Sequence, residues 1–122
     1  RGMHMQLDPY AEVKLVRCIH GRIYDVLVDL REDSPTYLKW DAVELTAENR
    51  RMLYIPVGCA HGYQTLEDES EVLYQISNVY APQHSVGYRY DDPAFGIEWP
   101  EPVTCLSEKD AAWPLYNAVV KS

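Results

Sequence analysis

Two tyrosines and an asparagine alternate with aliphatic residues along EVLYQISNVY, residues 71–80. If this segment is a strand, Tyr74, Asn78 and Tyr80 share one face with Val72 and Ile76. A buried phenol hydroxyl needs a hydrogen-bond partner, so such a face usually contacts water, a ligand or a polar network. The alternative is that both tyrosines pack at the edge of a core.

Charged and titratable side chains alternate in the same way nearer the N-terminus. In RGMHMQ, residues 1–6, His4 and Gln6 fall on one face of an extended segment and the methionines on the other. Lys14 and Asp25 lie on two predicted strands joined by a tight turn at Gly21, so they could pair across a hairpin. That pair would hold a lysine in place and aim it into a cavity. The alternative is two solvated charges that add little to stability.

A third segment, PVGCAHGY at residues 56–63, places a histidine directly after a turn. The pattern P-x-G-x-x-H resembles a cupin-type signature, in which the histidine, here His61, points into the mouth of a small β-barrel. In many cupins that histidine binds a metal, which would need about three further ligands. The chain has no H-x-H pair and its four histidines are scattered, so we expect no metal site.

The elements that must position these residues are nearly all strands. Branched and aromatic residues recur between turn residues at roughly the 8–12-residue spacing of a sandwich or barrel. Strands are predicted within residues 1–6, 13–19, 21–31, 35–45, 51–56, 61–67 and 71–80, with a turn at residues 46–49. Residues 81–106 are predicted to form an ordered loop with one short strand. Ser107 could cap a terminal helix that Pro114 would interrupt.

Length and composition exclude several classes of protein. The 122 residues predict one domain, and no apolar run is long enough to span a membrane. The net charge of -8 argues against a sequence-independent hold on nucleic acid. Cys18, Cys59 and Cys105 are too few and too scattered for a disulfide framework, which favours a reducing compartment, the cytoplasm.

The chain resembles the dTDP-4-dehydrorhamnose 3,5-epimerase family of RmlC-like cupins. The match is collinear and is carried by RGMHMQ, EVKLVRC, GRIYDVLVDLR, SPTY, LTAENRRMLYIPVGCAHGYQTL, EVLYQISNVYAP, DDPAFGIEWP and LSEKDAA. The resemblance implies an all-β, cupin-type double-stranded β-helix (jelly roll) over residues 1–122, with a short C-terminal helical appendage. It also implies a cytoplasmic homodimer that extends its sheets, with no nucleic-acid or membrane partner.

The activity implied by the resemblance is a metal-independent, cofactor-free isomerisation. Carbons 3 and 5 of a nucleotide-linked 4-keto-6-deoxy sugar are inverted through an enolate, which converts dTDP-4-dehydro-6-deoxyglucose to dTDP-4-dehydrorhamnose. This reaction serves the biosynthesis of dTDP-rhamnose and of polysaccharides that contain rhamnose.

The resemblance also implies a role for individual residues. His4 corresponds to the catalytic base, Asp110 to its partner and Tyr74 to the proton donor, while Lys14 lies near the keto oxygen. The positions expected to bind substrate are Arg1, Gln6, Asp25, His61, Tyr80 and Lys109, with Tyr80 stacking on the thymine. From spacing alone, Lys109 and Asp110 are ordinary residues of a helix start.

Two alternatives share these residues. The same acid and base would serve an enzyme that inverts only one carbon, or one that acts on a related nucleotide sugar. A catalytically silent sugar-nucleotide binding module is a different class of answer. It is motivated by Ser85, where the family often has a glutamate that contacts the nucleotide, and by the expectation that the chain lacks the family's N-terminal region.

Overall fold

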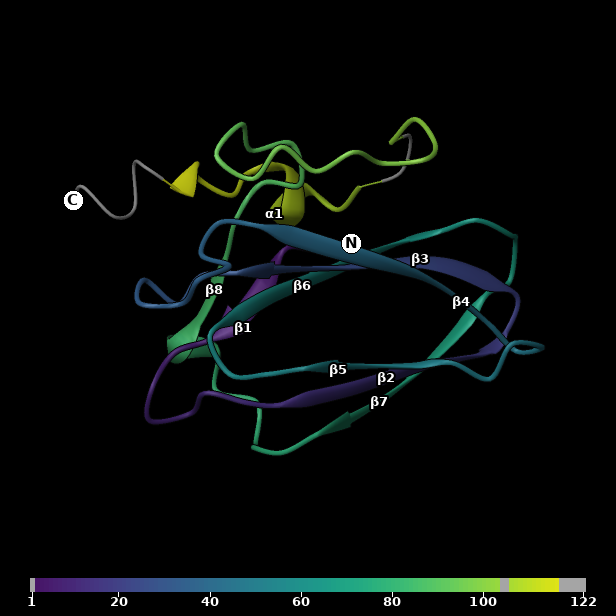
Figure 1. The fold of residues 1–122 in the computed structure, drawn as a ribbon, viewed down its shortest axis with the longest axis horizontal. Helices are drawn as coiled ribbons and strands as arrows, with labels where there is room; N and C mark the ends of the chain where they lie inside the picture. The colour runs from purple at the N-terminus through teal and green to yellow at the C-terminus, as the bar shows by residue number, and fades with distance from the viewer. Residues whose placement is uncertain (1, 104–105, 117–122) are drawn as a thin grey trace.

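Two antiparallel sheets form the framework of the computed structural model, which describes residues 2–103 and 106–116. One sheet has the strand order β4-β3-β6-β1-β8 and the other has the order β5-β2-β7. The strands are β1 (His4–Gln6), β2 (Lys14–His20), β3 (Arg22–Asp29), β4 (Trp40–Thr46), β5 (Met52–Ile55), β6 (Cys59–Thr65), β7 (Glu71–Ile76) and β8 (Ser85–Gly87). Figure 1 shows the sheets as two facing layers, which confirms the predicted jelly roll.

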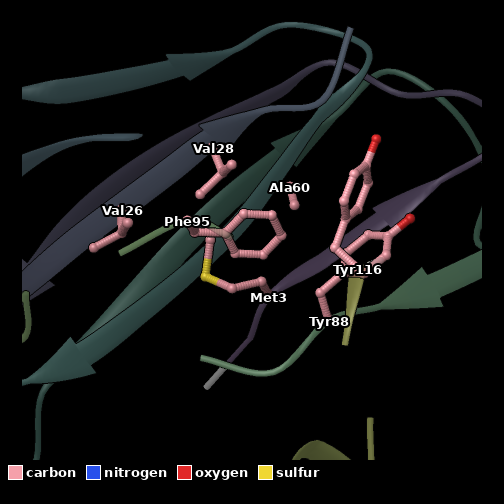
Figure 2. Packing of buried hydrophobic residues seen from close by; sticks show 7 residues of the cluster. All are labelled: Met3, Val26, Val28, Ala60, Tyr88, Phe95 and Tyr116. Carbon is pink, nitrogen blue, oxygen red and sulfur yellow. The ribbon is translucent and has the colours of Figure 1, made fainter. Parts of the chain in front are cut away.

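The sheets are held by two cores, one on each side of the five-stranded sheet. The core between the sheets is formed by Val16, Cys18, Ile23, Leu45, Ile55 and Cys59. The other core packs Met3, Val26, Val28 and Ala60 against Tyr88, Phe95 and Tyr116, as Figure 2 shows. Because alternate residues of β3 enter different cores, a one-residue slip would expose both sets, and the register is therefore strongly specified.

The segment that follows β8 covers the outer core. In Figure 1 it lies over the layer of β3, β4 and β6 and leads to helix α1 (Glu108–Ala111). The hydroxyl of Ser107 accepts the backbone N–H of Asp110 at 3.0 Å, which confirms the predicted helix cap. Within the described ranges, no helix has the length and apolar character needed to cross a membrane.

The predicted hairpin at Gly21 is wrong. Strand β2 pairs with β5 and β7, whereas β3 pairs with β4 and β6, so the chain crosses from one sheet to the other at this turn. The expected pairing of Lys14 with Asp25 across that hairpin is therefore also wrong, because their strands are not hydrogen-bonded neighbours. A tight turn signals that the chain reverses direction but does not say whether the flanking strands hydrogen-bond to each other.

Other boundaries follow local chemistry. The turn at residues 46–49 is confirmed, since the Thr46 hydroxyl accepts the backbone N–H of Asn49 at 2.8 Å. Strand β7 ends at Ile76, earlier than predicted, and β6 begins earlier than predicted, at Cys59.

The thiols of Cys18 and Cys59 are buried and not in disulfides, and Cys105 lies outside the described residues.

Asp29, at the end of β3, organises the loop that delays the start of β4 until Trp40. Its carboxylate accepts hydrogen bonds from the backbone N–H and guanidinium of Arg31 and from the hydroxyls of Ser34 and Thr36. The side-chain hydrogen bond from Arg31, supported by those from the two hydroxyls, outweighs burial and holds the pKa of Asp29 well below its usual range.

Replacing this carboxylate should destabilise the fold in a pH-dependent way. We expect Asp29→Asn to lower the free energy of unfolding by about 1–3 kcal/mol at neutral pH, because several donors lose a charged acceptor that is itself buried. Since the pKa is lower in the folded state, the carboxylate's contribution is complete above ~pH 4 and is lost as pH falls toward the folded pKa. Urea unfolding at several pH values measures both effects.

Asp91→Asn is the matched control, because Asp91 also pairs with an arginine two residues away, but its side chain is 42% exposed. We expect this variant to unfold nearly as the parent does. An Asp29→Asn variant as stable as the Asp91→Asn variant would contradict the role of the buried carboxylate.

Candidate active site

A cavity of about 830 Å³ lies between the two sheets near β1 and α1, a volume typical of small-molecule sites. It receives side chains from β1, β2, β6, β7 and β8 and from the segment around α1. The predicted site residues that line it are His4, Gln6, Lys14, His61, Tyr74, Tyr80, Lys109 and Asp110. Asp25 is fully buried and does not line the cavity, and Arg1 lies outside the described residues.

His4 and Asp110 form a hydrogen-bonded pair at the cavity wall. Nε2 of His4, on β1, lies 2.6 Å from Oδ1 of Asp110, on α1. Burial raises the pKa of Asp110, but hydrogen bonds from His4 and Trp113 outweigh burial and leave that pKa lowered. The side chain is therefore a carboxylate at neutral pH and can only accept, so Nε2 of His4 carries the hydrogen and Nδ1 is the basic nitrogen.

Trp113 is a site residue that the sequence reasoning missed. Its indole Nε1–H donates to Oδ1 of Asp110 at 3.0 Å, and its ring lies edge-on to His4 with centroids 5.9 Å apart. A tryptophan beside a proline suggests ordinary packing. In the sequence, Trp113 stands three residues after Asp110, in a segment that Ser107 is predicted to cap. Residues three apart on a helix lie next to each other, so this spacing could have identified Trp113 as a neighbour of Asp110.

His61 and Asp25 form a second, more deeply buried pair. Nε2 of His61, on β6, hydrogen-bonds Oδ1 of Asp25, on β3, and the imidazole lines the cavity. Among the described residues, Oδ2 of Asp25 has no hydrogen-bond partner although it is buried. Burial lowers the pKa of His61, and the hydrogen bond to Asp25 opposes that shift only in part.

Lys14 contributes a cation from the three-stranded sheet, across the cavity from His4 and His61. Its Nζ lies 3.6 Å from the carboxylate of Glu12, and both side chains are mostly buried at the cavity. Arg17, three residues further along β2, is exposed. Lys14 and Arg17 thus lie on opposite faces of the strand, as their odd separation predicts.

The alternating face of residues 71–80 lines the cavity, as its polarity suggested. Tyr74, Ile76, Asn78 and Tyr80 all contribute to the wall, although the strand itself ends at Ile76. The Tyr74 ring lies edge-on to His61, with centroids 5.9 Å apart. Tyr80 is 69% exposed, so an aromatic face stands at the mouth of the cavity.

Gln6 ties the cavity wall together. Its amide nitrogen donates to the carbonyls of Tyr10 and Val79, at 2.8 and 3.1 Å, and its oxygen accepts from the Ala81 N–H and the Ser85 hydroxyl, at 2.8 and 3.3 Å. These contacts fix the segment between β7 and β8. Substrate contact by Gln6 stays a prediction.

The donor atoms of the cavity suit proton transfer better than metal binding. In the part of the chain that the structure describes, no group of three or more His, Cys, Asp or Glu side chains could hold a metal ion. Two carboxylate–histidine pairs, a lysine and a tyrosine instead offer acids, bases and a cation around one space.

Burial should keep the imidazole of His61 from taking up a proton. We expect His61 to stay a neutral imidazole well below pH ~6.5, because burial disfavours its charged form. The unfolded chain binds that proton at higher pH, so burial of His61 should also cost stability as pH falls below ~6.5. Nitrogen-15 NMR of the histidine rings measures the protonation directly. Protonation of His61 at or above pH ~6.5, the ordinary value for a histidine, would contradict the expectation.

Comparison with known proteins identifies a family to which the chain is similar. The sequence profile of a family described as dTDP-4-dehydrorhamnose 3,5-epimerase matches residues 1–118. A dTDP-4-dehydrorhamnose 3,5-epimerase of Sinorhizobium fredii is 48% identical over 115 residues, which cover 93% of this chain and 59% of the relative. The chain thus spans about 59% of that relative's length.

Two solved structures share the fold closely. A dTDP-6-deoxy-D-glucose-3,5-epimerase of Legionella pneumophila, in complex with dTDP-4-keto-L-rhamnose, has a TM-score of 0.92 at 38% identity and covers 98% of this chain and 63% of its own. A 3'-monoepimerase of Streptomyces bikiniensis, in complex with dTDP-quinovose, has a TM-score of 0.92 at 31% identity, with coverage of 99% and 62%.

Proposed function

Because the chain belongs to the dTDP-4-dehydrorhamnose 3,5-epimerase family, we propose that it inverts carbons 3 and 5 of a dTDP-linked 4-keto-6-deoxy sugar. The observation that carries this proposal is the His4–Asp110 pair, which faces a cavity that Tyr74 lines from the other sheet. The substrate we propose is dTDP-4-dehydro-6-deoxyglucose, and the product is dTDP-4-dehydrorhamnose.

His4 acts as the base. The carbonyl at carbon 4 acidifies the C–H bonds at carbons 3 and 5, because the carbanion that forms is an enolate. Nδ1 of His4 takes one of these protons, and the C–H electron pair becomes part of the enolate. Asp110 accepts from Nε2–H throughout, so it stabilises the imidazolium that forms, as in other histidine–carboxylate pairs.

Tyr74 acts as the acid. It belongs to β7 in the three-stranded sheet, whereas His4 belongs to β1 in the five-stranded sheet. An acid and a base on different walls can reach opposite faces of a sugar ring, which inversion requires. The Tyr74 hydroxyl gives a proton to the enolate carbon, and exchange with water restores both groups, so the net reaction consumes no proton.

Lys14 stabilises the negative charge that develops on the keto oxygen. An ammonium in a mostly buried site is worth more to a developing oxyanion than one in water. The carbonyl already acidifies both protons, so the chemistry itself needs neither a metal nor a nicotinamide. Tyr80 offers a face for the thymine, while Lys109 and His61 lie where they could contact the pyrophosphate or the sugar. The free thiols of Cys18 and Cys59 support a reducing compartment, the cytoplasm.

Inversion at a single carbon is the second candidate. It is favoured by the close match to the Streptomyces bikiniensis 3'-monoepimerase, whose fold superposes as well as that of the 3,5-epimerase. The same base and acid serve both reactions, so the residues named above do not separate them. The two reactions differ in the number of carbons that exchange hydrogen, so this number distinguishes them.

Proton exchange in heavy water tests the proposal. With dTDP-4-dehydro-6-deoxyglucose, we expect proton NMR signals at carbons 3 and 5 to disappear as deuterium replaces hydrogen. His4→Asn should slow the exchange at both carbons by ~10²–10⁴-fold, the usual contribution of a positioned base. Tyr74→Phe should slow product formation by a similar factor while leaving some exchange on the side of the base.

The matched controls are His20→Asn on β2, which is exposed, and Tyr24→Phe on β3, which does not line the cavity. Both should exchange at the parental rate. Exchange at one carbon only would replace the proposal with the single-carbon reaction. No exchange by a folded protein that binds dTDP would leave a binding module and overturn the catalytic roles.

We also propose that two copies associate through the three-stranded sheet, by extending it at an open edge and covering its outer face. Ile19, Met52, Tyr54 and Leu73 are 43%, 47%, 60% and 44% exposed on these three strands. Strand pairing places Met52 and Leu73 on either side of Arg17, so the apolar side chains share one face. An apolar face of this kind on a sheet with open edges supports self-association.

Sedimentation velocity over a range of concentrations tests the dimer. We expect the parent to sediment as a dimer and Leu73→Glu to shift it to the monomer, because a carboxylate would be buried without a partner in the interface. Leu7→Glu is the control, since Leu7 is 43% exposed but lies outside this sheet. A parent that remains monomeric, or equal dissociation of both variants, would overturn the proposal.

A further inference from the structure

Trp113 contacts the proposed base pair but has no part in the proton transfers described above. Its Nε1–H donates to Oδ1 of Asp110 at 3.0 Å, and His4 Nε2 lies 2.6 Å from that same oxygen. The two rings meet at 70° with centroids 5.9 Å apart. One carboxylate oxygen therefore serves two N–H donors, an imidazole and an indole.

The indole is itself held in place from two sides. Nζ of Lys109 lies 5.5 Å from the centroid of the Trp113 ring, within the range of a cation–π contact. On β8, Gly87 is the Cα partner of His4, and a Cβ at Gly87 would collide with the indole ring. The ring thus rests on the backbone of the strand next to His4.

We propose that Trp113 is a positioning residue, which fixes the Asp110 carboxylate for His4 and draws part of its negative charge away from the imidazole. A carboxylate stabilises an imidazolium most when its charge is directed at the imidazole alone. A second donor on the same oxygen weakens that stabilisation, so the indole N–H makes His4 a weaker base than the Asp110 contact alone would. The assignment rests on the proposed function for its catalytic meaning.

Other charges also face His4, so the test must leave them unchanged. The groups are Asp110 and Lys109 on the α1 segment, His61 on the paired strand β6 with Asp25 behind it, and Lys14 with Glu12 on the opposite wall. Replacement of Trp113 by phenylalanine keeps an aromatic ring beside Lys109 and changes the charge of none of these groups. A change in the titration of His4 then reports the loss of the indole N–H.

The first experiment is a titration of His4 in Trp113→Phe by nitrogen-15 NMR, without substrate. We expect the His4 pKa to rise by roughly 0.5–1 unit relative to the parent, because Oδ1 of Asp110 now directs its charge at His4 alone, while the backbone N–H of Gly2 stays on Oδ2. In steady-state kinetics, the acid limb of the kcat/KM profile should move to higher pH by the same amount. At pH values below that limb, kcat/KM should be ~3- to 10-fold lower than in the parent. At higher pH, where kcat/KM is constant, it should change little.

Trp99→Phe is the matched control, because the Trp99 indole donates at 3.0 Å to the carbonyl of Tyr90 and does not line the cavity. His4 should titrate in this variant as in the parent. An unchanged His4 titration in a folded Trp113→Phe variant, or an equal shift in Trp99→Phe, would overturn the proposal.

A measurement on the parent protein covers the case in which Trp113→Phe does not fold. The indole N–H signal of Trp113 should change with pH at the same midpoint as the His4 ring, while the signal of Trp99 should not. A Trp113 signal that ignores the titration of His4 would contradict the shared carboxylate. If this coupling is present but the sugar does not exchange, the proposed activity fails and the positioning role of Trp113 at the pair stands.

Discussion

The hydrogen bond between His4 and Asp110 is the contact on which the rest of the site depends. It joins strand β1 to helix α1 across 106 positions of sequence, so everything between must fold to bring the two side chains within 2.6 Å. Strand β1 contributes by lying between β6 and β8, where Gly2 approaches the neighbouring strand closely. A Cβ at Gly2, whose φ is +131°, would lie 2.5 Å from the Cα of Gly62.

The other half of the contact is held by the segment that packs on the outer core. Oδ2 of buried Asp92 accepts the backbone N–H of Tyr116 at 2.6 Å, and the hydroxyls of Tyr116 and Tyr37 lie 2.6 Å apart. Figure 2 shows Tyr116 beside Tyr88 in this core. Burial and the hydrogen bond with Tyr37 raise the pKa of Tyr116, so it remains a neutral anchor. Packing on the outer face of the five-stranded sheet therefore helps to position the carboxylate of Asp110, which lines the cavity on the inner face.

The strands and their faces could be predicted from the sequence, because alternation along a strand is a local property. The shared face of Tyr74 and Tyr80, the opposite faces of Lys14 and Arg17, and the cap at Ser107 all follow from neighbouring residues. The partition of strands into sheets could not be predicted in this way, since the turn at Gly21 looks the same whether β2 and β3 pair or separate. Asp25 was therefore matched with Lys14, although β3 places it against His61. Trp113 was missed because its contact with Asp110 depends on a helix of only one turn.

The order of the chain gives the His4–Asp110 contact a consequence for synthesis. Every strand of the described structure precedes Asp110, so a growing chain contains the residues of both sheets before the carboxylate has been added. His4 has no Asp110 to set its tautomer until the segment that follows β8 has also been made. A copy that ended before Asp110 would contain every described strand but not the hydrogen-bonded pair.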